Sequence, residues 1–325
     1  MVRAVVCRAL GAPETLRLEE LPSRALKPGE VRVAIRAAGL NFPDVLMAAG
    51  EYQLKPELPF TPGMEAAGDV IEVGAEARGA SVGDKVIVKM RHGAFTDEAV
   101  VMPSQLTPLP STFDYAEGAT FLAAHGTAYH GLIDRGKLQP GEVLLVHGAG
   151  GGVGLAAVEI GKLLGATVIA AASSEEKLKV AKARGADHLV LYAREPFRDA
   201  VKRITDGRGA DVVYDPVGGQ IFEDSVRCIA WGARLLVIGF TGGIGLARTN
   251  LLLIKGASVL GVRAGEAVRK DPALGEARLK VLLAWAEQGK IRPNVSHRLP
   301  LADYAAAMQL LIDRKAIGRV ALMMG

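Results

Sequence analysis

The pattern of hydrophobic and polar positions changes about 120 residues into the chain. Before that point, short apolar runs separated by Gly and Pro fall at residues 30–37, 67–74 and 84–89, and the first and last of them alternate apolar with polar residues. Alternation with a period of two is typical of strands that bury one face. We therefore expect this part to be mostly β, as a barrel or a sandwich. A capped helix start at 111–117 and a helical connector at 118–135 should follow.

After residue 121, β-branched runs alternate with segments whose apolar residues recur at helical spacing. The pattern predicts helices at 175–184, 196–204 and 221–230, and strands at 188–191, 211–215, 234–238 and 259–261. Such alternation implies a mostly parallel sheet with helices on both faces, whose ligand crevice lies outside the carboxyl ends of the strands. Two further helices and a terminal strand at 317–323, which should rejoin the first domain, complete the chain.

These patterns predict an α/β protein of two domains, for which 325 residues provide enough chain to bury two cores. One is a mostly-β domain built from residues 1–120 and 265–325. The other is a doubly wound parallel sheet built from residues 121–264, which we expect to bind a dinucleotide.

A glycine-rich turn organises the second domain. Residues 143–172 read as a β-branched run, consecutive glycines, a helical segment and a second β-branched run, which is a βαβ unit. Glycines let the backbone approach a pyrophosphate, and the following helix directs its free N–H groups at it. Ala149 replaces the first glycine of the usual pattern, which a tight turn accepts only if its φ stays negative. The expected pyrophosphate contacts come from Ala149, Gly151, Gly152, Val153 and Gly154.

The end of the second strand of this unit indicates which cofactor binds. An NAD site places Asp or Glu there, whereas this chain has Ala170-Ala-Ala-Ser-Ser174. Without a carboxylate to repel it, a 2′-phosphate fits, and Ser173, Ser174 and Lys177 supply hydroxyl donors and a positive charge. A capping box from Ser173 to Glu176 with a solvated Lys177 is the alternative, and both can hold. We predict NADPH in preference to NADH.

Composition narrows the choice of partner and compartment. The formal charge is only +4 and the basic residues are scattered, so nucleic acid is not the expected partner. Cys7 and Cys228 lack Cys-x-x-Cys spacing, which predicts buried reduced thiols rather than a disulfide framework. No run reaches the length of a membrane span and no leader pattern precedes the first strand, so we expect a cytoplasmic protein.

The sequence does not support a metal site, a hydrolase or a nucleoside triphosphatase. His125 and His130 come nearest to metal-ligand spacing, but no carboxylate or thiolate accompanies them in the sequence, so we expect structural histidines and no metal. His147 and His92 are likewise expected to be satisfied locally. Residues 79–83 match a nucleophile elbow but no helix follows, and residues 131–137 resemble a phosphate loop without its Ser or Thr.

Several segments together resemble the zinc-free quinone oxidoreductases, or zeta-crystallin-like branch, of the medium-chain dehydrogenase/reductase superfamily. Besides the glycine turn they are AGLNFPD at 38–44, GEY at 50–52, PGMEAAG at 62–68, VGDKV at 82–86, DVVYDPVGG at 211–219 and GRV at 318–320. Zinc-containing members carry Cys at the position of Asn41, a His at that of Met64 and a four-cysteine lobe that is missing between Val88 and Val101.

The resemblance implies a GroES-like catalytic domain, completed by the C-terminal segment, and a Rossmann domain, with the active site in the cleft between them. It also implies homodimers or tetramers, often joined through the last strand of the nucleotide-binding sheet. The implied substrate is a small quinone or enone.

The resemblance also assigns residues by position. Asn41 and Tyr52 should face the nicotinamide, with Asp44 nearby, and Thr127 should approach the carboxamide or the pyrophosphate. The remaining implied cofactor contacts are Ser173, Lys177 and Tyr192 around the 2′-phosphate and Gly239, Phe240 and Arg319 at the border of the cofactor.

The expected reaction is NADPH-dependent reduction of a quinone or an α,β-unsaturated ketone or aldehyde, without zinc. Tyr52 and the Asn41 amide are the candidate donors to the developing oxyanion. One alternative is an enoyl thioester reductase, for which Arg263 and Arg269 could meet CoA phosphates. Another is a non-catalytic protein, either a crystallin-like NADPH-binding protein or an RNA-binding one.

Overall fold

The computed structural model describes residues 1–325, which form two compact units. One consists of Met1–Ala123 and Arg292–Gly325, and the other of Ala124–Ile291. Each unit has its own sheet and its own hydrophobic core. The fold is therefore the predicted combination of a GroES-like, mostly-β unit and a Rossmann-type unit.

The first unit is built around a seven-stranded sheet. Its order is β14-β15-β3-β4-β5-β7, and β6 pairs with β3. The strands are β3 (Val31–Leu40), β4 (Glu65–Val73), β5 (Lys85–Lys89), β6 (Glu98–Val101), β7 (Leu106–Pro108), β14 (Val295–Pro300) and β15 (Arg319–Met323). A separate antiparallel pair is formed by β1 (Val2–Val6) and β2 (Arg17–Leu21). Strands with one buried face alternate as expected, since Val31, Val33 and Ile35 are buried.

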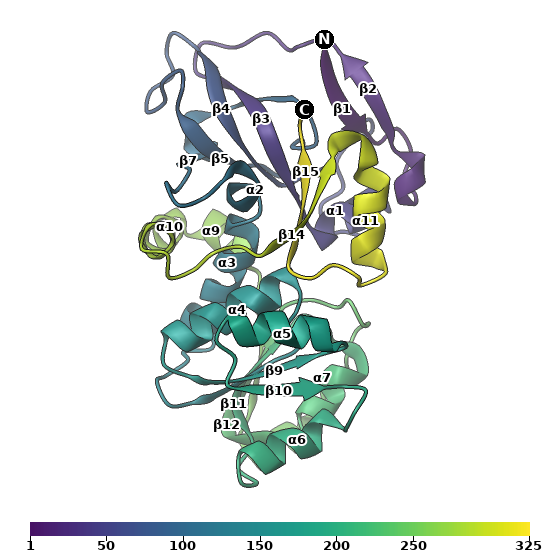
Figure 1. Ribbon diagram of the computed structural model, residues 1–325, viewed down its shortest axis with the longest axis vertical. Coiled ribbons are helices and arrows are strands. Elements are labelled where there is room, and N and C mark those ends of the chain that lie inside the picture. The colour runs from purple at the N-terminus through teal and green to yellow at the C-terminus, as the bar shows by residue number, and fades with distance from the viewer. The chain divides into compact units, whose positions relative to one another are not determined.

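The terminal strand rejoins this unit as the sequence predicts. β15 pairs antiparallel with β3, with Val320 opposite Leu40. The helical elements here are α1 (Phe42–Ala48), α2 (Tyr115–Gly118), α11 (Tyr304–Ile312) and the 3₁₀ turns η1 (Pro13–Thr15), η2 (Pro103–Gln105) and η4 (Leu301–Asp303). Figure 1 shows α11 beside α1, and the two helices are in contact.

The second unit has a six-stranded sheet in which every pair of neighbours is parallel. Its order is β10-β9-β8-β11-β12-β13, so the sequence of strands reverses between β8 and β11. The strands are β8 (Val143–Val146), β9 (Thr167–Ala172), β10 (His188–Leu191), β11 (Ala210–Asp215), β12 (Ile229–Val237) and β13 (Ser258–Gly261). This is the predicted doubly wound sheet, for which the expected position of a ligand is at the carboxyl ends of the strands.

Helices cover both faces of this sheet. Val143 and Leu145 pack in one cluster with residues of α6 (Phe197–Ile204) and α7 (Gly219–Ser225), while Leu144 faces Gly161 of α4 (Gly152–Leu163). Figure 1 shows α4 and α5 on one side of the strands and α6 on the other. The remaining helices are α3 (Leu122–Tyr129), the π-helical turn η3 (His130–Arg135), α5 (Glu175–Ala183), α8 (Thr249–Lys255), α9 (Ala264–Lys270) and α10 (Pro272–Glu287).

The predicted boundary near residue 264 is too early. Helices α9 and α10 belong to the second unit, where Arg278 of α10 donates to Asp134 at 2.9 Å and to His130 at 3.2 Å. The C-terminal region also holds a strand, β14, that the sequence pattern missed, and three helices rather than two after residue 264. The helix predicted at 221–230 ends at Ser225, because β12 begins at Ile229.

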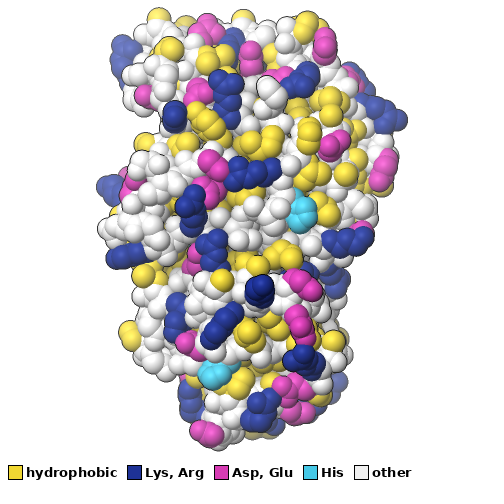
Figure 2. All heavy atoms as spheres, viewed as in Figure 1, with side chains coloured by type: hydrophobic (Ala, Val, Ile, Leu, Met, Phe, Trp, Pro, Cys, Tyr) yellow, Lys and Arg dark blue, Asp and Glu magenta, His cyan; other side chains and the backbone are white.

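The outer surface carries mixed charge. On the face drawn in Figure 2, Lys and Arg side chains are interspersed with acidic ones. Among the helices of residues 1–325, none combines the length and the hydropathy needed to cross a bilayer.

Candidate functional site

The glycine turn follows β8 directly. Its left-handed residue is Gly148, with φ of +55°, and Ala149 is not among the residues with positive φ. The condition that the sequence places on Ala149 is therefore met, because the conformation that favours glycine lies one position earlier. The turn closes with a hydrogen bond from the Gly151 N–H to the Gly148 carbonyl at 2.9 Å.

The start of α4 forms a cradle that only a bare backbone can make. A Cβ on Gly154 would lie 2.3 Å from the Gly148 carbonyl oxygen, so no larger residue fits there without a shift. Gly151 caps the helix without a side-chain hydrogen bond, which leaves the first N–H groups of a 12-residue helix available to an anion. The residues present thus fit the pyrophosphate of a dinucleotide.

Two hydroxyls and an ammonium gather where β9 ends. The Ser174 side chain caps α5 by accepting from the Lys177 N–H at 3.4 Å, and Lys177 Nζ lies 3.4 Å from Ser173 Oγ. The cap is therefore Ser174, and not Ser173 as the alternative interpretation has it. A Cβ on Gly150 would lie 2.4 Å from Lys177 Cβ, so the stem of Lys177 rests against the glycine turn.

Tyr192, which follows β10, has other partners than the expected 2′-phosphate. Its hydroxyl lies 2.9 Å from Nδ1 of His147 and 3.4 Å from the Gly148 nitrogen. His147 is fully buried, and its Nε2 lies 2.8 Å from Ser225 Oγ. Burial lowers the pKa of His147 to about 3, so the ring is neutral.

The hydroxyl of Ser225 determines the direction of each hydrogen bond in this series of side chains. Ser225 donates its only hydroxyl proton to the Ile221 carbonyl at 2.7 Å, so it accepts from His147 Nε2. His147 Nδ1 then accepts from the Tyr192 hydroxyl, whose oxygen accepts from the Gly148 N–H. This chain, which we call the Tyr192 chain, links α7 to the glycine turn. Sequence reasoning missed it because its members lie far apart along the chain.

Asp215 at the end of β11 holds the neighbouring loop. Its Oδ1 accepts from the N–H groups of Val217 and Gly218 at 2.8 and 3.0 Å, while Oδ2 is buried without a hydrogen-bond partner. Burial raises the pKa of this carboxyl, against the effect of the two N–H donors. Gly239 and Phe240 lie past β12, which ends at Val237, and the Phe240 side chain is 51% exposed.

In the first unit, Asn41 and Asp44 are brought together at the start of α1. Asn41 is the N-cap, and its N–H donates to Asp44 Oδ2 at 2.8 Å. The other carboxylate oxygen of Asp44 is buried with no partner. Burial raises the pKa of Asp44 to about 7; the Asn41 N–H opposes this, and the nearby charge of Glu65 adds to it.

Glu65 and Arg319 complete this buried cluster. Arg319 donates to Glu65 Oε1 at 2.5 Å and to Asn41 Oδ1 at 2.9 Å, and the Asn41 amide donates to Glu65 at 3.2 Å. Glu65 also accepts from the Ala123 N–H at 2.9 Å. The sequence assigned no role to Glu65, although a lone carboxylate opening a strand of Ala and Gly was a signal that it needed a partner.

The other predicted residues lie apart from these clusters. Tyr52 is half-buried against the core of the first unit and has no hydrogen-bond partner for its hydroxyl. Thr127 is half-buried in α3 of the second unit. Their predicted cofactor contacts remain predictions.

Family models match both units. One described as an alcohol dehydrogenase GroES-like domain covers residues 27–111, and one described as a zinc-binding dehydrogenase covers residues 152–277. A curated relative, the quinone oxidoreductase-like protein 2 homolog of Nematostella vectensis, is 37% identical over 324 residues, which is 98% of this chain and 88% of the relative.

Solved structures extend the similarity along the whole chain. Escherichia coli quinone oxidoreductase complexed with NADPH gives a TM-score of 0.90 at 28% identity and covers 99% of both chains. A structure described as an NAD-dependent alcohol dehydrogenase gives 0.90 at 34% identity and covers 99% of this chain and 100% of its own. CurK enoyl reductase gives 0.89 at 27%, covering 100% and 99%.

The side chains present do not fit the zinc ion that one of these descriptions implies. Carboxylates do accompany the two histidines nearest to ligand spacing, contrary to the sequence-based expectation: His125 lies 3.0 Å from Glu159, and His130 lies 2.9 Å from Asp134. Each is a pair, and nowhere in residues 1–325 do three His, Cys, Asp or Glu side chains group as a metal site. At Asn41, the side-chain oxygen of Asn41 and Oε1 of Glu65 already accept from the Arg319 guanidinium, which leaves one Asp44 oxygen without a partner.

Proposed function

The chain belongs to the quinone oxidoreductase branch of the medium-chain dehydrogenase/reductase superfamily, and from this premise we propose that it is a zinc-independent NADPH oxidoreductase. The proposed acceptor is a conjugated carbonyl compound, either a quinone or an α,β-unsaturated ketone or aldehyde. The observation that carries the proposal is the buried cluster of Asn41, Glu65 and Arg319, whose side chains hydrogen-bond to one another.

The proposed cofactor seat divides into two parts. The N–H groups at the start of α4 hold the pyrophosphate, and Ser173, Ser174 and Lys177 hold the 2′-phosphate. When bound, NADPH supplies the hydride. The similarity to an NADPH complex supports this choice of cofactor, and the absence of a carboxylate at the end of β9 supports it independently.

Tyr52 is the proposed donor to the acceptor oxygen. Its phenol has no partner in the structure, whereas the Asn41 amide already donates to the Gly39 carbonyl and to Glu65 at 3.4 and 3.2 Å. A free donor aimed at a developing oxyanion is worth about 3–4 kcal/mol in a dry site. Asn41, the other candidate donor, is held by Arg319 through its side-chain oxygen and keeps its amide protons on Gly39 and Glu65.

A screen of NADPH consumption over quinones, enones and enoyl thioesters tests the function. With the best acceptor, Tyr52→Phe should lower kcat about 100-fold and leave the KM for NADPH unchanged. Tyr304→Phe is the matched control, because its hydroxyl donates to the Leu16 carbonyl within the core at 2.7 Å. Full activity of Tyr52→Phe would remove this phenol from the reaction, and no oxidation of NADPH with any acceptor would favour a non-catalytic binding protein.

A second candidate is reduction of an enoyl thioester, which the likeness to CurK enoyl reductase favours. Of the two arginines that could meet CoA phosphates, Arg269 is engaged by Glu266, and Arg263 is exposed at the start of α9. A kcat/KM for crotonyl-CoA above that of every quinone and enone tested would establish this alternative.

We also propose a homodimer joined through β13. This strand forms the edge of the sheet and pairs only with β12. Large apolar side chains on neighbouring elements are exposed, with Trp231 at 78% and Leu253 at 81%. Light scattering should give twice the chain mass, and Leu253→Lys should shift it toward the monomer.

A further inference from the structure

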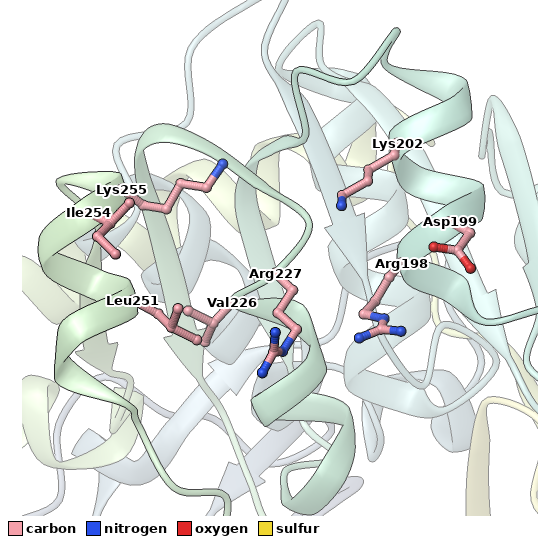
Figure 3. A pocket seen from close by; sticks show the side chains of 8 residues that line it. All are labelled: Arg198, Asp199, Lys202, Val226, Arg227, Leu251, Ile254 and Lys255. Carbon is pink, nitrogen blue, oxygen red and sulfur yellow. The ribbon is translucent and has the colours of Figure 1, made fainter.

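A basic pocket lies in the second unit, away from the glycine turn. It has a volume of about 340 Å³ and is lined by α6, by α8 and by the turn between α7 and β12. Figure 3 shows Lys202 and Lys255 reaching toward each other from two helices, with Arg198 and Arg227 below them. Leu251 and Val226 supply apolar wall, and the volume lies within the range of small-molecule sites.

Three of the four cations of this pocket have no charged partner. The side chains of Lys202, Arg227 and Lys255 take part in no hydrogen bond or ion pair in the structure. Arg198 forms an ion pair with Asp224 at 3.7 Å, and Asp199 is the only acidic side chain in the lining. Four positive side chains from three separate elements therefore face one small volume, where they repel one another unless an anion is present.

Three of these cations act electrostatically on one buried thiol. Burial raises the pKa of the Cys228 thiol to about 12, and the positive charges of Lys202, Arg198 and Lys255 oppose that rise. The thiol is buried directly after Arg227. Cys228 is thus close enough to three cations of the pocket for their charges to act on it, and the carboxylate of Asp224 acts in the opposite direction.

The pocket is lined by none of the residues of the glycine turn. Arg227 precedes the amino end of β12, whereas the turn follows the carboxyl end of β8, and β8, β11 and β12 run parallel. The two features are therefore built from different segments of the second unit. The basic pocket is a separate feature that the proposed oxidoreductase chemistry does not use.

We propose that this pocket binds the diphosphate group of a small molecule. A diphosphate carries enough negative charge for several cations, and guanidinium and ammonium groups are its usual partners in proteins. The apolar wall of Leu251 and Val226 suits an organic body attached to that group. Inorganic pyrophosphate and a nucleoside diphosphate both carry the diphosphate group. Comparing the binding of pyrophosphate with that of ADP distinguishes these two kinds of ligand.

Calorimetry with ADP, pyrophosphate and adenosine, at low ionic strength and with NADPH absent or in excess, tests the proposal. ADP or pyrophosphate should bind with NADPH present, while adenosine should not bind. Tighter binding of ADP indicates an organic ligand, and equal affinity indicates that the diphosphate alone is recognised. Lys202→Ala and Arg227→Ala should each weaken binding about ten-fold, and Asp199→Asn should tighten it about three-fold by removing the acidic side chain of the lining.

Lys280→Ala is the matched control, because Lys280 is exposed on α10 and also lacks a charged partner. It should leave the affinity unchanged. Absence of binding in the unaltered protein would overturn the proposal, as would equal affinity of the Lys202→Ala/Arg227→Ala variant. The comparison of variants measures diphosphate binding and does not depend on NADPH binding. A failure of the proposed oxidoreductase function would therefore leave this test unaffected.

Discussion

The hydroxyl of Tyr192 lies 2.9 Å from Nδ1 of the buried His147 and so joins the end of one strand to the turn that follows another. The same hydroxyl accepts from the Gly148 N–H, at the only left-handed residue of the glycine turn. We infer that Tyr192 positions the cofactor seat through this turn rather than by contacting the 2′-phosphate.

Removing this hydroxyl should affect binding more than turnover. In Tyr192→Phe, His147 Nδ1 and the Gly148 N–H both lose a partner, and an unsatisfied buried group costs about 1–3 kcal/mol. We expect a rise of about three- to ten-fold in the KM for NADPH, with kcat nearly unchanged, and a lower unfolding free energy in urea. Tyr304→Phe should lower stability by a similar amount and leave the KM alone. An unchanged KM in Tyr192→Phe would contradict the positioning role.

Asp44 should make the protein less stable as pH rises. Its folded pKa of about 7 lies above the ordinary value of 3.8, so between these pH values the native state binds more protons than the unfolded state. The unfolding free energy therefore falls as pH rises from about 4 to about 7, by roughly 4 kcal/mol at most. Urea unfolding at a series of pH values should show this fall, and Asp44→Asn should flatten it.

Asp114 supplies the opposite case for comparison. Partial burial is the largest single influence and raises the pKa of Asp114. The Glu117 N–H and Arg298 together act more strongly in the other direction, so the pKa is lowered. A group with a depressed pKa stabilises above its unfolded value and loses that contribution as pH falls. Asp114→Asn should therefore lower stability at neutral pH and leave the fall assigned to Asp44 in place. The same pH dependence in Asp44→Asn as in the unaltered protein would reject that assignment.

Arg319 should matter more to stability than an exposed arginine. Arg319→Met leaves Glu65 buried without its cation, and breaking a buried pair costs about 3–5 kcal/mol. Arg3→Met, which removes an exposed pair with Asp97 at 2.8 Å, should cost less than about 1 kcal/mol. The Arg319→Met/Glu65→Met variant should recover much of the loss. Equal costs for the two single variants in urea unfolding would show that the buried cluster is unimportant to stability.

Lys177 should set the preference between the two cofactors. Lys177→Ala removes the ammonium near Ser173 Oγ, so kcat/KM for NADPH should fall about ten-fold or more while that for NADH changes little. Lys179→Ala, on the exposed side of the same helix, should leave both values unchanged. If Lys177→Ala lowered both values equally, the 2′-phosphate assignment would be wrong.

The fold was predictable where the pattern is local. The βαβ unit at residues 143–172 carries its own turn chemistry and helix periodicity, and the alternation that follows it yields a parallel sheet. β14 was missed because it lies at the edge of the sheet, where none of its residues is fully buried. The polar residues His297 and Arg298 also interrupt its apolar pattern. The domain boundary was missed because it depends on Arg278 reaching Asp134, a contact across 144 positions.

The sequence could identify single residues of the candidate site, but not the contacts between residues from distant segments. Asn41 and Asp44 lie three apart and form a capping box, which sequence spacing can suggest. Their link to Glu65 and Arg319 requires β15 to pair with β3, and that pairing joins the two ends of the chain. The Tyr192 chain likewise needs the order of the strands, because neutral hydrogen-bonding side chains leave no charge pattern to follow.

The low pKa of His147 has a consequence for how the enzyme responds to acidity. Its ring stays neutral from mildly acidic to alkaline solution, so the hydrogen bonds behind the glycine turn keep the same donors and acceptors throughout. The conformation of the glycine turn should therefore not change with pH over this range. A bell-shaped rate profile in that interval would then report on other groups, such as Asp44, and not on the His147 imidazole.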